Sequence, residues 1–486
     1  MPAPRRTITI ANLALAGLAG LAITGLTLAS AAVATTGLQA APPAAQAAKA
    51  PAAEVPPVFG PAERDLDERI DPTRITRMDL PPLPERLMLP MPPDHRTAGA
   101  AEQVPISPEH WAAAQAAIAR GLESLAASQA ENGQWMNAVR TAPTDQPTRG
   151  DSVSVAVTAM AMRAFAQSSA SHPHAEAFAR ARHAVLSARQ ADGSFGAGPL
   201  GNYVTSVAIS ALAAVGEPES RDFALEGARW LMDSQWDQGE GLQPEQDWFG
   251  GAGYGRNGRP DLSNTQMMLE ALYDAGVSPD EPAVQRALAF VARTQNLAGT
   301  NPATWAGNDG GFIYTPAGGG ESMASEAAGE GRRGELLPEE APRALRSYGS
   351  MSYAGFKSLL YAGLGSEDPR VRAVFDWIRR NYSFDENPGL GQQGVFYYFH
   401  AAARALRVGQ QVTIDSIEDG PRNWREDLID ALVARQDERG GWTNPTDRWL
   451  ESERPLSTAY AVLALQEALK PVTFPAPSRP SGEDRD

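Results

Sequence analysis

The sequence predicts an all-α fold built from six helical hairpins. Two observations predict it. A turn made of a Gln, a Gly and an aromatic residue recurs along the chain, and the helix after most turns carries a hydroxyl residue seven places before a large apolar one. Seven residues make two helical turns, so both anchors lie on one face of that helix.

The turn pattern marks the end of the first helix of each hairpin. Gly permits positive φ where that helix stops, the Gln amide can bond the exposed N–H groups of the next helix, and the aromatic ring fills the gap between them. These residues are therefore predicted to be structural. The clear copies run from Gln129 to Trp135, Gln190 to Phe195, Gln235 to Tyr254, Gln295 to Phe312 and Gln436 to Trp442, and a degenerate copy lies around Asn381 and Gly394-Val395-Phe396.

The second helix of each hairpin carries the other pair of anchors. Neighbouring anchors are 47 to 87 residues apart, which suits helix pairs with variable loops and excludes a rigid short-period solenoid. The first helices are amphipathic and the second more apolar, so the first should form an outer ring around the second. The anchors are Thr158 and Phe165, Thr205 and Leu212, Thr265 and Leu272, Ser352 and Leu359, Thr458 and Leu465, with Phe399 and Leu406 in the same register without the hydroxyl.

The chain divides into four parts. Residues 1–40 contain Arg5 and Arg6 before an apolar run from Ile8 to Val33, typical of a signal peptide or an uncleaved N-terminal membrane anchor. Residues 41–108 form a Pro/Ala-rich linker, 109–470 the repeat domain, and 471–486 a disordered tail. We therefore expect an exported protein at the periplasmic or extracytoplasmic face of the membrane, with membrane association through its N-terminus only.

Composition excludes several partners and cofactors. The net charge of -16, with no dense basic stripe, argues against nucleic-acid binding. The absence of Cys excludes disulfides, a thiolate nucleophile and Cys-ligated zinc. We predict no cofactor and no metal.

The repeated turn on six hairpins resembles the squalene and terpene cyclases and the protein prenyltransferase β subunits. The resemblance spans about Trp111 to Lys470 and implies an (α/α)6 toroid, or barrel. Segments such as 310–314 and 346–351 look like those of uncharacterised exported bacterial members of this repeat family.

The known activities of that family lack their residues here. Its class II cyclases protonate an alkene with the middle Asp of an Asp-x-Asp-Asp motif, and the similar stretch, Asp261-Leu262-Ser263-Asn264, places Ser263 at the donor position. A hydroxyl cannot protonate an alkene, and Asp261 either caps the helix or has another role. The prenyltransferase zinc site needs a Cys, and no two Asp residues are adjacent to form a magnesium motif. Whether the protein is an enzyme therefore stays open.

Polar residues at the starts of the inner helices should meet at one mouth of the barrel. His400, in an aromatic run, is either a general acid or base or a buried neutral imidazole. Arg448, in a charged stretch with Glu451 and Glu453, either contacts a substrate or pairs within that stretch, and the insertion 316–342 is either a lid or an inert loop. The catalytic candidates are Asp261, Asp309 and His400, and the candidates for substrate binding are Asn264, Tyr348, Tyr353, Tyr397, Tyr398 and Arg448.

Three functions fit these residues. The first is binding or transformation of an isoprenoid or other hydrophobic small molecule, in which Tyr397 and Tyr398 stabilise a carbocation or simply pack. The second is polysaccharide lyase or hydrolase activity, with Tyr398 and His400 transferring protons and Arg448 binding a uronate. The third is a non-catalytic interaction module. An aromatic pocket favours the first, a wide polar cleft the second and a filled lumen the third.

Overall fold

The computed structural model describes residues 106–136, 149–168, 173–196, 200–341 and 344–472. The predicted leader, nearly all of the predicted linker and most of the predicted tail lie outside these residues. In the described part, twelve α-helices pair into six successive hairpins, which confirms the predicted all-α (α/α)6 toroid. The pairs are α2 (Pro108–Ser128) with α3 (Arg149–Ala166), α4 (Ala175–Ser187) with α5 (Gly201–Val215), α6 (Pro218–Asp233) with α7 (Leu262–Asp274), α8 (Pro282–Arg293) with α10 (Gly349–Tyr361), α11 (Pro369–Arg380) with α12 (Val395–Val408), and α13 (Trp424–Arg435) with α14 (Arg454–Leu469).

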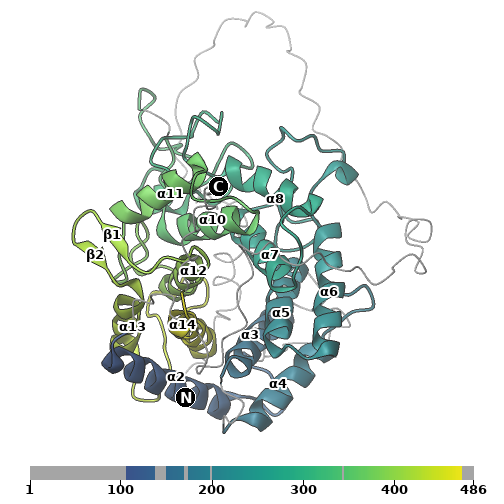
Figure 1. Ribbon diagram of the computed structural model, residues 1–486. Helices are drawn as coiled ribbons and strands as arrows, with labels where there is room; N and C mark the ends of the chain where they lie inside the picture. Colours follow the sequence, from purple (N-terminus) through teal and green to yellow (C-terminus); the bar gives the residue numbers. More distant parts are fainter. Residues whose placement is uncertain (1–105, 137–148, 169–172, 197–199, 342–343, 473–486) are drawn as a thin grey trace, which may run out of the picture. The chain divides into compact units, whose positions relative to one another are not determined.

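The second helices of the hairpins form a closed inner ring. Each of α3, α5, α7, α10, α12 and α14 packs against the next, and α14 returns to α3 (Figure 1). The inner helix α5 buries every residue from Gly201 to Leu212, whereas the outer helix α8 buries one apolar face that includes Ala287 and Phe290. One outer helix returns the chain between consecutive inner helices, so the inner helices run parallel, with their N-termini at one end of the lumen.

In four of the five clear turns, the Gln fastens the turn to the next outer helix. In the second turn, Gln190 Nε2 donates instead to Ala188 O at 2.9 Å. Gln129 Nε2 donates to the carbonyls of Gly133 and, in α4, Ala177, at 2.9 Å each. The last copy closes the ring, because Gln436 Nε2 donates to Gly440 O at 2.8 Å and to Ala117 O in α2 at 2.9 Å. The expectation that Gln would bond N–H groups is wrong, since its amide donates to carbonyl oxygens. Gln235 and Gln295 make the same pair of bonds, to Gly250 and Ala283 and to Gly310 and Arg370.

A positive-φ glycine in the same turns touches the backbone of the next outer helix. Gly133 has φ 81°, and a Cβ added there would lie 2.5 Å from the carbonyl oxygen of Arg180. At Gly250 the corresponding distance, to Arg286 O, is 1.8 Å. Glycine is therefore needed both for the left-handed backbone and for the close approach of the helix.

The hydroxyl anchors of the inner helices hold the aromatic residues of the turns. Thr205 Oγ1 accepts from the N–H of Phe195 at 2.9 Å, and Thr458 Oγ1 accepts from that of Trp442 at 3.1 Å. In the third hairpin the Thr265 hydroxyl binds the N–H of Ala252 at 3.0 Å, not that of Tyr254. The aromatic position of that turn is thus occupied by Ala252, and the assignment of Tyr254 to it is corrected.

Short elements lie in the connections. The insertion holds the helix α9 (Met323–Ala327), a 3-10 turn η2 covers Gln238–Glu240, and β1 (Ile414–Ser416) pairs antiparallel with β2 (Gly420–Arg422). Among the described residues, no helix combines the length and apolarity needed to span a bilayer.

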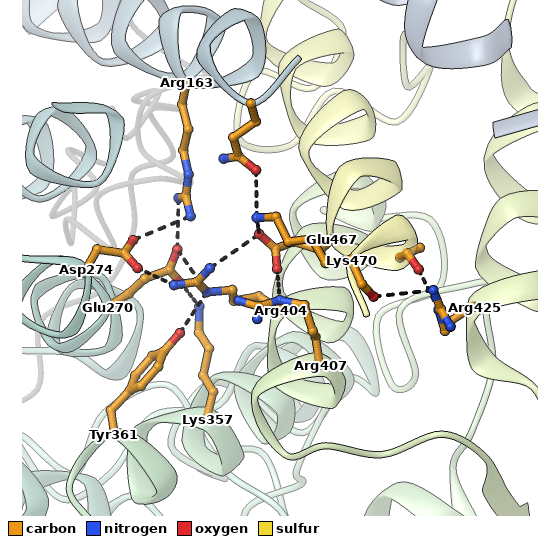
Figure 2. Close-up of polar contacts among 12 residues, drawn as sticks. Arg163, Glu270, Asp274, Lys357, Tyr361, Arg404, Arg407, Arg425, Glu467 and Lys470 are labelled. Atoms are coloured by element: carbon orange, nitrogen blue, oxygen red, sulfur yellow. Dashed lines mark hydrogen bonds and ion pairs between the residues drawn. The ribbon is translucent and has the colours of Figure 1, made fainter. Parts of the chain in front are cut away.

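A cluster of charged side chains fills the end of the lumen at the C-termini of the inner helices (Figure 2). Arg163 Nη1 lies 3.0 Å from Glu270 Oε1, and Lys357 also pairs with Glu270, whose side chain is 1% exposed. Burial alone would raise the pKa of Glu270, but Lys357, Arg404 and Arg163 hold it well below its usual value. We call this the lumen charge cluster, made of Arg163, Glu270, Asp274, Lys357, Arg404, Arg407, Glu467 and Lys470.

The turn geometry predicts a large difference between two glycine substitutions. Gly250 and Gly241 have similar φ values of 81° and 80°, but nothing lies within 4 Å of a Cβ added at Gly241. Gly241→Ala should cost about 1–2 kcal/mol of unfolding free energy through backbone strain alone. Gly250→Ala should cost about 2 kcal/mol more because Arg286 must move. Equal costs in urea unfolding would contradict the proposed contact.

The lumen charge cluster predicts that removing one carboxylate is destabilising. Glu270→Gln leaves Lys357 buried without its counter-charge and leaves Arg163 paired with Asp274 alone, so the unfolding free energy should fall by about 3–5 kcal/mol. Glu226→Gln, which removes the partner of Arg189 where the Glu226 side chain is 39% exposed, should change it by less than about 1 kcal/mol. Urea unfolding of both variants measures the contrast, and a similar small loss in both would contradict it.

Candidate active site

An aromatic pocket lies at the N-terminal end of the inner helices. The space between its walls amounts to about 580 Å³, including the part open to solvent. Apolar and aromatic walls with a few polar groups are typical of sites for hydrophobic small molecules. The lining residues are Tyr203, Tyr254, Ser263, Tyr314, Met323, Tyr348, Ser350, Met351, Tyr397, Trp449, Glu451 and Tyr460.

The walls come from the inner helices and from the loops that cover their N-termini. In four places, the loop before one inner helix supplies the acceptor for the first N–H groups of the preceding inner helix. Three of these acceptors are backbone carbonyls, and the fourth is the carboxyl of Glu451. The bonds are Tyr203 N to Tyr254 O at 3.3 Å, Leu262 N to Tyr314 O at 2.8 Å, Gly349 N to Pro388 O at 2.8 Å, and Tyr397 N to Glu451 Oε1 at 2.8 Å.

Glu451 is held in place from two sides. Its Oε2 accepts from Asn444 Nδ2 at 2.8 Å while Oε1 caps α12, and the residue is 1% exposed. The two residues before it, Trp449 and Leu450, both have φ 66°. Bulky residues in this left-handed region cost free energy and persist only where the surrounding structure holds them, which is common at functional sites.

Burial raises the pKa of Glu451 to about 7, although the hydrogen bonds from Asn444 and from the N–H groups of Tyr397, Phe396 and Val395 oppose the shift. A large share of the molecules therefore carries a protonated Glu451 at neutral pH. A carboxylic acid kept neutral beside an apolar pocket is the arrangement that general-acid catalysis requires.

Asp261 is a second buried carboxyl, one layer behind the pocket wall. It caps α7 by accepting from Asn264 N at 2.8 Å, and its carboxyl also binds the Asn264 amide and the Tyr314 hydroxyl. Burial raises the pKa of Asp261 to about 6, while the bonds from Asn264 and Tyr314 lower it. Because Tyr314 itself lines the pocket, its hydroxyl connects Asp261 to the pocket.

Hydroxyl groups form pairs within the pocket. Ser263 Oγ and Gln266 Nε2 both lie 3.1 Å from the Tyr397 hydroxyl, and the hydroxyls of Tyr203 and Tyr460 are 3.3 Å apart. Burial raises the pKa of Tyr397 and of Tyr460, so these phenols stay neutral at physiological pH. Ser263, at the position of the family's proton donor, therefore faces the pocket as a hydroxyl and not as an acid.

His400 lies outside the residues that line the pocket. Its ring centroid is 5.7 Å from that of Tyr460, and its Nε2 is buried with no hydrogen-bond partner among the described residues. Burial lowers the pKa of His400 to about 3, and the opposing attraction of Glu270 is smaller. The imidazole is therefore neutral, between the pocket and the lumen charge cluster.

The remaining candidates occupy three different places. Tyr353 and Tyr398 belong to the aromatic core, with ring centroids 5.6 Å apart, and do not line the pocket. Asp309 is half-buried, accepts from Ser347 Oγ at 2.8 Å and lines a separate polar pocket. Arg448 lies at the rim of the aromatic pocket, where its guanidinium stacks over Trp449 at 4.8 Å.

Tyr348 and Tyr397, both predicted to bind substrate, line the pocket, whereas most of the other wall residues were not predicted as site residues. Glu451 was noted only as part of a charged stretch, and Tyr254 only as a turn residue. The one sequence signal for Glu451 was its place as an acidic residue in the loop before the last apolar inner helix. In the part of the chain that the structure describes, no group of three or more His, Asp or Glu side chains could hold a metal ion.

The raised pKa of Glu451 predicts how stability varies with pH. Between its ordinary pKa of 4.5 and its folded value of about 7, the unfolded chain ionises Glu451 while the folded protein does not. The stability that the protonated Glu451 contributes to the folded state is therefore fully present below pH 4.5 and is lost as pH rises to about 7. The free energy of unfolding changes by on the order of 3 kcal/mol over this range. In Glu451→Gln, this fall in the unfolding free energy with rising pH should be absent. Urea unfolding of the wild type and the variant at pH 4.5 and pH 8 measures the difference. Identical pH dependence in both proteins would contradict the shift.

Comparisons with known proteins agree with this architecture. Residues 109–315 match the family model of the squalene-hopene cyclase C-terminal domain. No curated protein matches the chain significantly. Among solved structures, the type II terpene cyclase MstE from Scytonema in complex with geranylgeranyl dihydroxybenzoate is 14% identical over 74% of this chain and 98% of its own, with a TM-score of 0.43.

Two further solved structures are similarly distant. The ligand-free form of the same Scytonema enzyme is 13% identical over 74% of this chain and 99% of its own, with a TM-score of 0.44. A protein from Actinoplanes is 14% identical over 73% of this chain and 99% of its own, with a TM-score of 0.32. The family match covers less than half of the chain, and over residues 109–315 it confirms the predicted resemblance to squalene and terpene cyclases.

Proposed function

We propose that the protein binds an isoprenoid-like ligand in the aromatic pocket and transforms it by protonating a carbon–carbon double bond, with Glu451 as the acid. Glu451 thus takes the catalytic role for which Asp261, Asp309 and His400 were the candidates from the sequence, and Asp261 acts behind Tyr314. The family match to a squalene-hopene cyclase domain supports this class of ligand.

The observation that carries the proposal is a carboxyl where the fold requires only an acceptor. At α10, the corresponding loop caps the helix with a backbone carbonyl and with the amide oxygen of Asn387, which accepts from Ser350 N at 2.9 Å. A neutral oxygen is thus sufficient for capping. At α12 the acceptor is the carboxyl of Glu451, which also lines the pocket. Helix capping alone therefore does not explain why this position holds a carboxyl and not a neutral amide.

The surrounding groups suit an acid-initiated reaction. Glu451 gives its proton to one alkene carbon, the other becomes a carbocation, and Glu451 becomes a carboxylate. The rings of Tyr397, Tyr460 and Trp449 can stabilise the cation through their π faces. The three N–H groups at the start of α12 and the positive end of its dipole stabilise the new carboxylate. Loss of a proton from the cation ends the reaction, and Glu451 regains its proton from solvent.

The apolar run at the N-terminus adds a proposed location. Although that segment lies outside the described residues, an export signal or anchor would place the body at the extracytoplasmic membrane face, close to lipid-soluble ligands.

Deuterium incorporation tests the proposed step. In heavy water, the full chain should convert a polyprene such as geranylgeraniol or squalene to a product that carries one solvent deuteron on carbon, as detected by mass spectrometry. Glu451→Gln should lower the rate by about 100-fold or more, while still capping α12 and binding ligand. The wild-type rate should fall as pH rises through about 7, because the protonated acid is required.

Glu453→Gln is the matched control. Glu453 is exposed, two residues away, and makes no side-chain cap bond to α14, so its variant should keep the wild-type rate. Undiminished turnover in Glu451→Gln would exclude Glu451 as the acid. Failure of the wild type to bind any polyprene would refute the proposed ligand class.

A further inference from the structure

The rim of the aromatic pocket holds two arginines that share one carboxylate. Arg448 Nη2 lies 2.6 Å from Glu326 Oε2, and Arg332 Nε lies 3.1 Å from Glu326 Oε1. The two guanidinium groups therefore bind the two oxygens of a single carboxylate. Fixed N–H donors of this kind suit carboxylate and phosphate groups.

This arginine pair lies beside the pocket itself. Arg448 stacks over the ring of Trp449, which lines the pocket, and its Nη1 donates to Gln393 Oε1 at 2.6 Å. Burial raises the pKa of the hydroxyl of Tyr348, another wall residue, and the positive charges of Arg448 and Arg332 oppose this shift. A ligand in the pocket could therefore reach both guanidinium groups with one end.

The insertion supplies the carboxylate that now occupies the pair. Met323 of α9 lines the pocket, and Glu326 lies one helical turn later on the same short helix. The Met323 side chain is buried, whereas that of Glu326 is 38% exposed. Glu326 can therefore turn into solvent while Met323 and the rest of α9 stay in place.

The local charge also favours an anion. Around Glu326 two arginines oppose one carboxylate, and next to them Arg259 and Arg333 share Glu321 in the same way. At these two carboxylates the guanidinium groups outnumber the carboxylates, although the whole chain carries a net charge of -16. Such a local excess attracts an anionic group even to an acidic protein.

We propose that the ligand of the aromatic pocket is an amphiphile with an anionic end, a carboxylate or a phosphate ester, which replaces Glu326 on Arg448 and Arg332. The inference rests on the proposed function, since it assigns the apolar part of the same ligand to the pocket. In the ligand-free protein, Glu326 occupies the anion site as an internal substitute.

Calorimetric titration of the full chain with three ligands of one chain length tests the proposal. Geranylgeraniol is neutral, whereas geranylgeranoic acid and geranylgeranyl monophosphate carry the two candidate anions. At least one anion should bind the wild type about tenfold more tightly than the alcohol, as expected for charge-assisted hydrogen bonds. The preferred anion identifies the group.

Three variants separate the contributions of the rim. Arg448→Gln and Arg332→Gln should remove most of the preference for the anion and leave the affinity for the alcohol unchanged. Glu326→Gln should increase anion affinity several-fold because the internal competitor loses its charge. Arg346→Gln, four residues after the insertion and paired with Glu330 on it, is the matched control and should bind all three ligands like the wild type.

The outcomes distinguish this inference from the proposed function. Equal affinity for alcohol and anions in the wild type, unchanged by Arg448→Gln and Arg332→Gln, overturns the anion site but leaves the isoprenoid pocket in place. Lack of binding by all three ligands refutes the proposed ligand class and the anion site together.

Discussion

A Gln side chain that ties the turn to the following outer helix, present in four of the six hairpins, is the contact on which the ring depends. Its amide donates to the glycine carbonyl of its own turn and to a carbonyl of the next outer helix, and Gln436 uses this geometry to join the last turn to Ala117 in the first helix. Glycines such as Gly250 allow the two backbones to approach closely. Hairpins that are locally simple thereby close into a ring with parallel inner helices.

Parallel inner helices give the two ends of the lumen opposite electrostatic character. Their C-termini, each equivalent to about half a negative charge, point toward the lumen charge cluster, where five cations oppose three carboxylates. The partial negative charges of the helix C-termini balance this excess of cations. At the other end, the positive N-termini face the pocket. The carboxyl of Glu451 lies in the pocket wall, and that of Asp261 lies behind it. The fold itself thus places the acidic groups beside the aromatic walls.

The fold was more predictable than the site, for physical reasons. The Gln, Gly and hydroxyl anchors act within one hairpin or between neighbours, so their repetition is visible in the sequence. Glu451 caps the start of α12 at Tyr397, which lies 54 residues earlier in the chain. Nothing in its local sequence distinguishes it from Glu453. Tyr254 was misassigned because Ala252 takes the aromatic position of its turn. Burial, which sets the pKa of Glu451 and of His400, is likewise a property of the closed ring.

The most direct measurement is a crystal structure of the Glu451→Gln protein with a bound polyprenyl ligand. We expect an apolar chain between Tyr254, Tyr397 and Trp449, with a double bond in van der Waals contact with the side-chain amide of the substituted residue. Ligand bound only in the polar pocket beside Asp309, or an aromatic pocket that stays empty at saturating ligand, would contradict it.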